Sequence, residues 1–207
     1  MKSQNKKTKN TKNTKKKPRH NALNFFAEAG LLKKIKRSGW WVAGIKDPES
    51  VAEHCFRCAV IGYYLAHLEK ADPYKVTVMT LFNDIHEARI NDLHKMGHLY
   101  IDFKDAEKRV FKEQIKDLDK SVKSELERFR RDLDNQGSKE SIVARDADIL
   151  ECLLQAKEYY DGGHLGVKRF FHRAPGYLRT KSAKAMWNGI KNWHSGSWWE
   201  KIVKFER

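Results

Sequence analysis

Residues 50–63 read SVAEHCFRCAVIGY, and this stretch decides the fold class because it carries both a helix start and a helical period. Ser50, with Glu53 three residues later, forms a capping-box pattern in which each side chain accepts from a backbone N–H that the first turn leaves unpaired. Apolar side chains then recur every four residues, at Val51, Cys55, Ala59 and Tyr63. The stretch therefore predicts an amphipathic helix that runs from about residue 50 to about residue 70.

The chain after residue 23 carries the same kind of signal. Asp72 followed by Pro73 predicts a second helix start, because Asp accepts from open N–H groups and Pro fits the first helical position. No Val/Ile/Thr-rich alternation of the kind that builds strands is present, so we expect one all-α domain, a helical bundle over residues 21–207. The expected loop covers about 40–48, and the other expected helices cover about 23–35, 73–88, 105–133, 138–162 and 180–193.

The composition restricts the class of protein. Of the 207 residues, 40% are hydrophobic and only 4 are Pro, which excludes a collagen-like or wholly disordered chain. No apolar run approaches the roughly 20 residues that cross a bilayer, and residues 1–20 lack the apolar stretch of a secretory signal. The three cysteines (Cys55, Cys58 and Cys152) fit free thiols in a reducing compartment. We therefore expect a cytoplasmic protein with no membrane partner.

The positive charge is concentrated in residues 1–20. Nine Lys and Arg residues and no acid lie between Lys2 and Arg19, and without them the formal charge of +15 falls to +6. This Lys/Asn/Thr-rich segment has too little apolar surface to order itself, so we expect a disordered basic arm. The arm is either a solvated, solubilising extension or a nonspecific contact for nucleic acid, since counterion release carries no sequence information.

Three stretches place ionisable side chains on helices whose other faces are apolar: residues 49–54, 83–87 and 146–148. Within the second, Asn83 and Glu87 are four apart and Asp84 and Glu87 three apart, so one helix face would carry all three. Taken singly, His54 also suits a core or surface position and Asp148 an ordinary helix-face carboxylate. Brought together by helix packing, they would give the mixed nitrogen and oxygen ligands that suit a divalent transition metal at a hydrolytic site.

These stretches resemble the HD-domain metal-dependent phosphohydrolases, and within them the branch of 5'-deoxynucleotidases. The resemblance covers about residues 23–205. It rests on the ordered blocks RSGW (37–40), PESVAEH (48–54), DIHEA (84–88) with ND (91–92), and Asp148 followed by LQAKEY (154–159). It implies an all-α HD fold and a hydrolase that removes phosphate from nucleoside 5'-monophosphates, deoxynucleotides in particular, which would be its small-molecule partners.

The resemblance also implies a divalent metal ion (Mn, Co, Fe, Mg or Zn), with His54, Asp84 and Asp148 as ligands. Asn83 stands where the family has the histidine of its dyad. A neutral amide oxygen is a weaker donor than an imidazole nitrogen, so we expect metal affinity to fall. His86, three positions further on, is an alternative ligand. Two origins of Asn83 are open: a ligand lost in the lineage, or a substitution introduced to trap a substrate complex.

Four further residues match substrate and catalytic positions of the family. Glu87 matches a glutamate that acts as acid or base on the hydrolytic water or the leaving group. Asp92, eight residues after Asp84, matches an acid that holds the sugar and the attacking water. Arg37 matches an arginine that binds the phosphate, and Trp40 an aromatic that shapes the sugar and base pocket. A guanidinium can bind phosphate in bidentate fashion and an indole face can pack on a base or sugar, so these roles are physically sound.

Two other functions are alternatives to this one. A catalytically impaired HD scaffold would bind nucleotide or nucleic acid without turnover, and the weak donor at Asn83 favours it. An HD phosphodiesterase would keep the chemistry and change the substrate, because one fold can host both reactions. The presence of Glu87 favours an enzyme, since a pure binder has less need of it. A second copy of the chain is a further candidate partner.

Two other patterns are interpreted as packing. Cys55-x-x-Cys58 falls within a helix and has no second thiol or histidine pair at zinc spacing. Residues 168–173 mix basic and aromatic side chains as nucleic-acid platforms do, but they also fit an amphipathic turn that points Phe170 and Phe171 inward. We therefore expect neither pattern to carry the chemistry.

Overall fold

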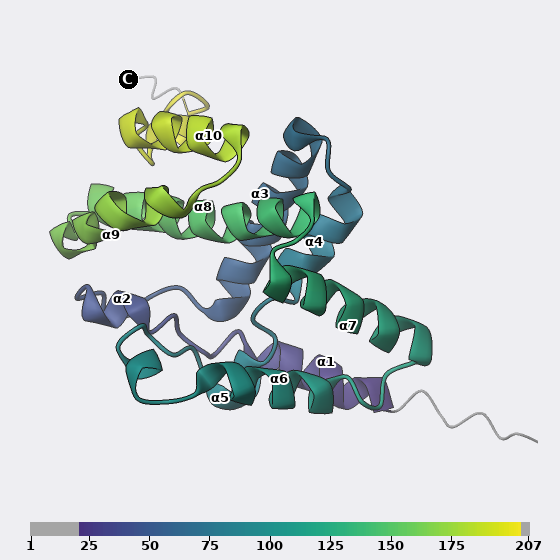
Figure 1. Cartoon of the computed structure of the whole chain (residues 1–207). Helices are drawn as coiled ribbons and strands as arrows, with labels where there is room; N and C mark the ends of the chain where they lie inside the picture. The colour runs from purple at the N-terminus through teal and green to yellow at the C-terminus, as the bar shows by residue number, and fades with distance from the viewer. Residues whose placement is uncertain (1–20, 204–207) are drawn as a thin grey trace, which may run out of the picture.

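The computed structural model describes residues 21–203, and over this range the chain is all-α, as the sequence predicts (Figure 1). No strand occurs in this range, where an isolated bridge pairs Lys36 with Ser50. The α-helices are α1 (Asn21–Leu31), α2 (Gly39–Val42), α3 (Val51–Glu69), α4 (Pro73–Leu81), α5 (Glu87–Ile90), α6 (Phe103–Gln114), α7 (Lys120–Asn135), α8 (Lys139–Asp161), α9 (Lys168–Arg173), α10 (Lys181–Asn192) and α11 (Ser197–Glu200). None of these helices is both long and apolar enough to cross a membrane. The predicted basic arm, residues 1–20, lies outside the described residues.

Helices that have clear capping residues begin where the sequence predicts. The capping box of α3 is complete: Glu53 N–H donates to Ser50 Oγ at 3.2 Å, and Ser50 N–H donates to Glu53 Oε2 at 2.6 Å. At the start of α4, the Asp72 side chain accepts from two backbone N–H groups, and at α10 the Thr180 hydroxyl accepts from one. Each such cap stabilises its helix by about 1 kcal/mol.

The predicted helix over 105–133 is wrong, because two helices, α6 and α7, occupy this region. The chain turns between them at residues 115–119. Ile115 is completely buried and Leu118 packs against the same apolar cluster, so the turn lets both side chains reach the core. Tertiary packing outweighs helix propensity here.

Three other predicted boundaries differ from the structure. The first helix ends at Leu31 instead of residue 35, and part of the expected loop over 40–48 forms the short helix α2. The helix expected over 73–88 ends at Leu81; residues 82–86 form turns, and α5 begins at Glu87. Phe82 and Ile85 both pack into the apolar cluster that also holds Ala88 of α5. The single helix face predicted for Asn83, Asp84 and Glu87 is therefore replaced by a compact turn.

The bundle is built on α3 and α8, with α4, α7 and α10 packed around them (Figure 1). Leu65, Leu150 and Leu153 are at most 1% exposed at this centre, and burial of each side chain contributes about 2 kcal/mol. The first residues of α3 enter a second apolar cluster, where Val51 and Ile115 meet side chains of α1 and α6. His54 lies on the part of α3 that belongs to this second half of the bundle.

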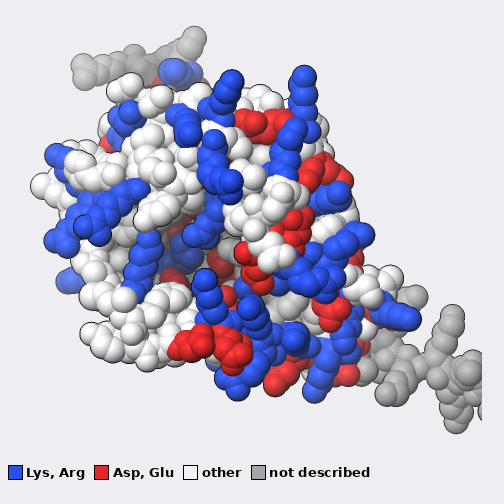
Figure 2. Space-filling model, in the orientation of Figure 1, with Lys and Arg blue, Asp and Glu red and all other residues white. Residues whose placement is uncertain are grey.

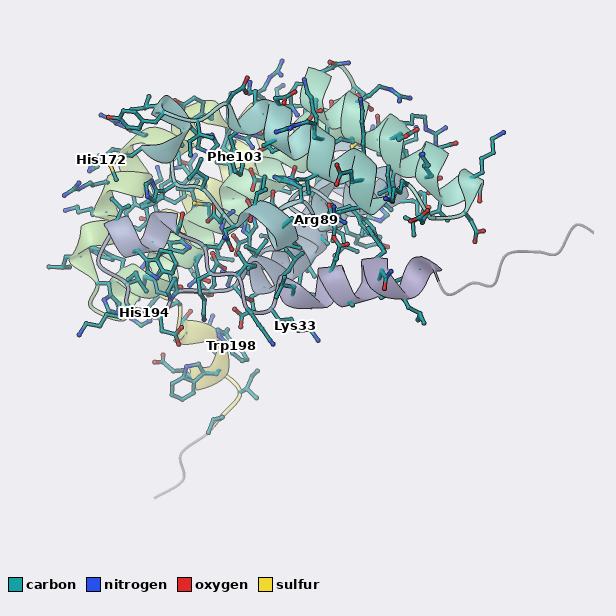
Figure 3. All side chains as sticks on the ribbon, turned by 90° about the horizontal axis from the view of Figure 1, so that it is seen from below. Lys33, Arg89, Phe103, His172, His194 and Trp198 are labelled. Carbon is teal, nitrogen blue, oxygen red and sulfur yellow. The ribbon has the colours of Figure 1, made fainter. Side chains whose placement is uncertain are left out.

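Ion pairs and aromatic contacts fix the periphery. Arg89 of α5 bridges Glu28 of α1 at 2.7 Å and Glu113 of α6 at 3.0 Å, and Figure 3 shows it between these helices. The interpretation of residues 168–173 as packing is confirmed by two ring contacts. The ring centroids of Phe170 and Trp40 are 4.6 Å apart, and those of Phe171 and Trp187 are 5.6 Å apart.

Candidate metal centre

Two of the predicted ligands, Asp84 and Asp148, lie close to the third, His54, although all three come from distant parts of the chain. His54 lies on α3, Asp84 in the turn after α4, and Asp148 on α8. The Nε2 atom of His54 is 3.1 Å from Asp148 Oδ1 and 3.5 Å from Asp84 Oδ2. His54 is only 1% exposed and the Asp148 side chain 19%, so neither group points into bulk solvent.

The distances from His54 to the two carboxylates suit ligands of one divalent ion. Atoms that each lie about 2.1 Å from a metal are about 3.0 to 3.4 Å apart in tetrahedral or octahedral geometry. The two distances from His54 Nε2 fall close to this range. One imidazole and two carboxylates are also a donor set that Mn, Fe, Co and Zn accept. The residues present therefore fit the metal that the sequence predicts.

The other nitrogen of His54 is held by a buried carboxylate. His54 Nδ1 is hydrogen-bonded to Oε2 of Glu151, which lies one turn after Asp148 on α8 and is fully buried. A proton on Nδ1 that is donated to Glu151 leaves the lone pair on Nε2, the nitrogen that faces Asp84 and Asp148. Carboxylates commonly orient metal-binding histidines in this way.

Cys58 lies too far out of the imidazole plane to share this role. Its sulfur is 3.8 Å from His54 Nδ1 and 3.5 Å from Nε2, nearly the same distance from both nitrogens. In the ring plane such a position would collide with the carbon between them, so the sulfur lies over the ring face. His54, Cys58 and Glu151 form a cluster of possible donors, but its atoms surround the imidazole instead of a shared point in front of it. Cys55 and Cys58 are buried and form no disulfide, as their interpretation as packing residues predicts.

Asn83 and His86 both lie in the turn after α4, and both line the cavity beside Asp84 and Asp148. Asn83 lines the same cavity as Asp84 and Asp148, and its backbone carbonyl accepts from Arg130 of α7 at 3.0 Å. His86 is buried against Glu107 and Arg130. Its Nε2 atom is 3.4 Å from Glu107 Oε1, and its Nδ1 atom is 3.4 Å from Arg130 Nη1. His86 therefore packs toward α6 and α7, and the structure does not bring it to His54 as a replacement ligand.

Arg37 approaches the same oxygen of Asp84 that faces His54. Its Nη1 atom is 3.8 Å from Asp84 Oδ2, and its side chain is 18% exposed. Burial opposes the charge of the guanidinium, but the carboxylates of Asp84, Asp92 and Glu87 together raise its pKa well above the ordinary value. The guanidinium therefore stays charged beside the donors that face His54, where a phosphate group could be bound.

Glu87 is a buried acid with an open hydrogen-bonding position. Burial first, and then the charges of Asp84 and Asp92, raise its pKa well above the ordinary value for a carboxyl group. Its Oε2 atom has no hydrogen-bond partner among residues 21–203. A buried polar atom without a partner is uncommon, so this oxygen is placed to bind a water molecule or a ligand and to exchange a proton with it.

Asp92 and Trp40 lie close to Arg37, and both make contacts within the fold. Asp92 Oδ2 accepts from the Ser38 N–H at 2.7 Å, which ties the segment after α5 to the start of α2. Trp40 is 2% exposed; its Nε1–H donates to Glu49 at 2.9 Å, and its ring packs on Tyr159 and Phe170. Because Tyr159 and Phe170 cover its ring, Trp40 has no open face on which a base or sugar could stack.

A cavity of about 390 Å³ opens beside Asp84 and Asp148. The face seen in Figure 2 is hollowed near its centre, with acidic side chains inside the hollow and Lys and Arg side chains around it. The residues that line the cavity from α6, α7 and α8 include Lys104, Glu107, Arg130 and Arg145. Arg145 Nη1 donates to Asp148 Oδ2 at 2.8 Å, so the second oxygen of this carboxylate is also held.

Sequence reasoning missed these cavity residues and Glu151. Glu151 could have been found, because it follows Asp148 by three residues on a predicted helix and so shares its face. Glu107 of α6 and Arg130 of α7 form an ion pair at 3.1 Å, and no sequence pattern links them.

Comparison with known proteins shows the family of this chain. A family model described as the HD domain matches residues 29–187, so the chain belongs to the HD domain family. It is 30% identical to the 5'-deoxynucleotidase HDDC2 of Dictyostelium discoideum over 152 residues, covering 70% of this chain and 80% of the relative. The human protein of the same name is 27% identical over 143 residues, covering 69% and 70%. A solved structure from Pyrococcus horikoshii superposes with a TM-score of 0.70 at 28% identity, covering 82% of this chain and 96% of the other.

Proposed function

We propose that this protein is a metal-dependent phosphohydrolase that removes the phosphate group from nucleoside 5'-monophosphates, with deoxynucleotides as the main substrates. The observation that carries the proposal is that Asp84 and Asp148 both lie within 3.5 Å of His54 Nε2, with Arg37 beside Asp84. Membership of the HD domain family and the similarity to proteins named 5'-deoxynucleotidase support the same activity and substrate class.

Each side chain of the site has a role that its surroundings support. His54, Asp84 and Asp148 would hold the metal, which when bound supplies a Lewis acid and lowers the pKa of a coordinated water. Arg37 binds the phosphate through parallel N–H donors and offsets the charge that develops on it. Glu87, buried and with Oε2 open, moves a proton to the leaving oxygen or from the water.

The cavity beside Asp84 supports a nucleotide-sized substrate. Its volume of about 390 Å³ lies within the range of small-molecule sites. Because the Trp40 ring is covered, we assign the nucleoside to this cavity instead of to the indole face. Asp92, whose Oδ2 accepts from Ser38, would keep Arg37 and its loop in place against the phosphate.

The substrate class is tested by phosphate release from the full chain with Co²⁺ or Mn²⁺. We expect turnover of deoxynucleoside 5'-monophosphates and little or no hydrolysis of bis(p-nitrophenyl) phosphate, a phosphodiester probe. Hydrolysis of the diester alone would replace the proposal with a phosphodiesterase. Nucleotide binding without hydrolysis of either substrate would favour the scaffold function that the weak donor Asn83 suggests.

The basic arm carries a separate prediction about nucleic acid. Nine positive charges and no acid lie between residues 2 and 19, so any affinity for DNA or RNA should come from them and show little sequence preference. With most of these charges in contact, affinity should fall about 10³-fold or more between 50 and 200 mM salt. A variant that begins at Ala22 should lose this binding and hydrolyse mononucleotides as before. Salt-resistant binding by the shortened chain, measured by filter binding, would move nucleic-acid contact to the folded body.

A further inference from the structure

Glu151, which holds His54, is itself held by an arginine. Arg57 follows His54 by three residues on α3 and reaches across to α8. Its Nε and Nη2 atoms lie 3.0 and 2.9 Å from Glu151 Oε1, while Glu151 Oε2 is bonded to His54. Each oxygen of this fully buried carboxylate therefore has its own cationic or hydrogen-bonding partner, and rotation of the carboxylate would break both contacts.

Arg57 is fixed in turn by two further residues of α8. Its Nη1 atom donates to both oxygens of Glu158 at 2.8 Å, and its Nη2 atom donates to Gln155 at 2.6 Å. Glu151, Gln155 and Glu158 are spaced by four and three residues, so one face of α8 presents all three to the guanidinium. The planar fork of arginine can satisfy these partners at once, whereas lysine offers a single point charge.

We propose that Arg57 is a positioning residue for the metal centre: it fixes the carboxylate of Glu151, which holds the His54 Nδ1–H and so keeps Nε2 aimed at the position between Asp84 and Asp148. The inference rests on the proposed metal-dependent function. Without the fork of Arg57, the charge of Glu151 is left buried with a single partner. Its carboxylate can then turn, and the imidazole loses its one fixed orientation.

Asn83 makes this support more important here than it would be beside a complete dyad. Among the proposed donors, His54 supplies an imidazole nitrogen, and Asn83 at the dyad position offers only an amide oxygen. A larger share of the metal affinity then depends on the orientation of a single ring. The effect of removing Arg57 should therefore shrink when a histidine is restored at position 83.

A purely structural role for Arg57, as a clamp between α3 and α8, predicts a different result. Loss of a clamp lowers the melting temperature but leaves the imidazole tautomer and the metal affinity of the folded protein unchanged. Arg89 offers a matched control, because it also joins two carboxylates on neighbouring helices and its side chain is 35% exposed against 26% for Arg57. An Arg89→Gln variant should lower stability and leave Co²⁺ affinity within about twofold of the wild type.

The experiment compares the full chain with Arg57→Gln, Arg57→Lys and Arg89→Gln by Co²⁺ titration and by ¹H–¹⁵N NMR of the histidine ring nitrogens, recorded without metal at a pH high enough for the His54 ring to be neutral. We expect Arg57→Gln to raise the Co²⁺ Kd about 10- to 100-fold and to replace the Nδ1–H signal of His54 with that of a mixture of tautomers. Arg57→Lys, which keeps a cation beside Glu151, should give a smaller rise and carries the test if the glutamine variant does not fold.

Two outcomes overturn the proposal. One is an unchanged Kd together with an unchanged His54 tautomer in the folded Arg57 variants. The other is an equal rise in Kd for Arg57→Gln and Arg89→Gln. If the wild type binds no Co²⁺, the proposed function fails, while the NMR comparison still decides whether Arg57 orients His54. In the Asn83→His background, Arg57→Gln should raise the Kd by a smaller factor, and an equal or larger factor would remove the link to Asn83.

Discussion

Phosphate release by a Glu87→Gln variant is expected to fall about 10²-fold or more, with little change in nucleotide affinity. Glutamine keeps the size of the side chain and most of its hydrogen bonding but has no ionisable proton. Glu87 is buried, its pKa is raised by burial and by Asp84 and Asp92, and its Oε2 atom is open to a ligand. Loss of a general acid or base usually costs 10²- to 10⁴-fold in turnover.

Steady-state kinetics on metal-saturated protein measure this effect, with Glu113→Gln as the control. Glu113 is an exposed partner of Arg89 and lies outside the site, so its variant should keep wild-type turnover. Turnover of Glu87→Gln at the wild-type rate would remove Glu87 from the mechanism. A rise in KM with unchanged kcat would assign it to substrate binding instead.

An Asn83→His variant is expected to bind Co²⁺ or Zn²⁺ about 10- to 100-fold more tightly and to show higher turnover when metal is limiting. Imidazole nitrogen is a better donor than an amide oxygen for these ions. Asn83 lines the cavity next to Asp84 and Asp148, so the new side chain begins beside the other donors. His86 packs against Glu107 and Arg130 and does not already supply this nitrogen.

Metal titration followed by phosphate release tests this expectation. Asn188→His places the same substitution on the exposed surface of α10 and should leave both measurements unchanged. If Asn83→His matches Asn188→His in metal affinity and turnover, position 83 does not act as a ligand position in this chain.

The parts of the fold that sequence could predict are those fixed by neighbours along the chain. Ser50 with Glu53, Asp72 with Pro73, and Thr180 mark helix starts because a cap depends on side chains within three residues. The turn at 115–119 could not be read in this way. It forms because Ile115 and Leu118 are drawn into a core assembled from α1, α3 and α5, which are distant in sequence.

The site residues also differ in whether neighbours along the chain could reveal them. His54, Asp84 and Asp148 stand in local patterns, and their meeting follows once three elements pack together. The turn that carries Asp84 was expected to be helical, and it places Asp84 Oδ2 3.5 Å from His54 Nε2. Glu107 and Arg130 line the cavity from two different helices and form an ion pair, a contact between residues 23 positions apart. The packing on Tyr159 and Phe170 that covers Trp40 likewise depends on contacts distant in sequence.

The central claim is that His54, Asp84 and Asp148 hold one divalent ion, and the amount of Co²⁺ bound per chain tests it most directly. Equilibrium dialysis followed by metal analysis should give about one ion per wild-type chain at saturation and almost none for Asp148→Ala at the same free concentration. The variant should keep the helical content of the wild type by circular dichroism. An equal amount of Co²⁺ bound by both proteins, or none bound by the wild type, would contradict the claim.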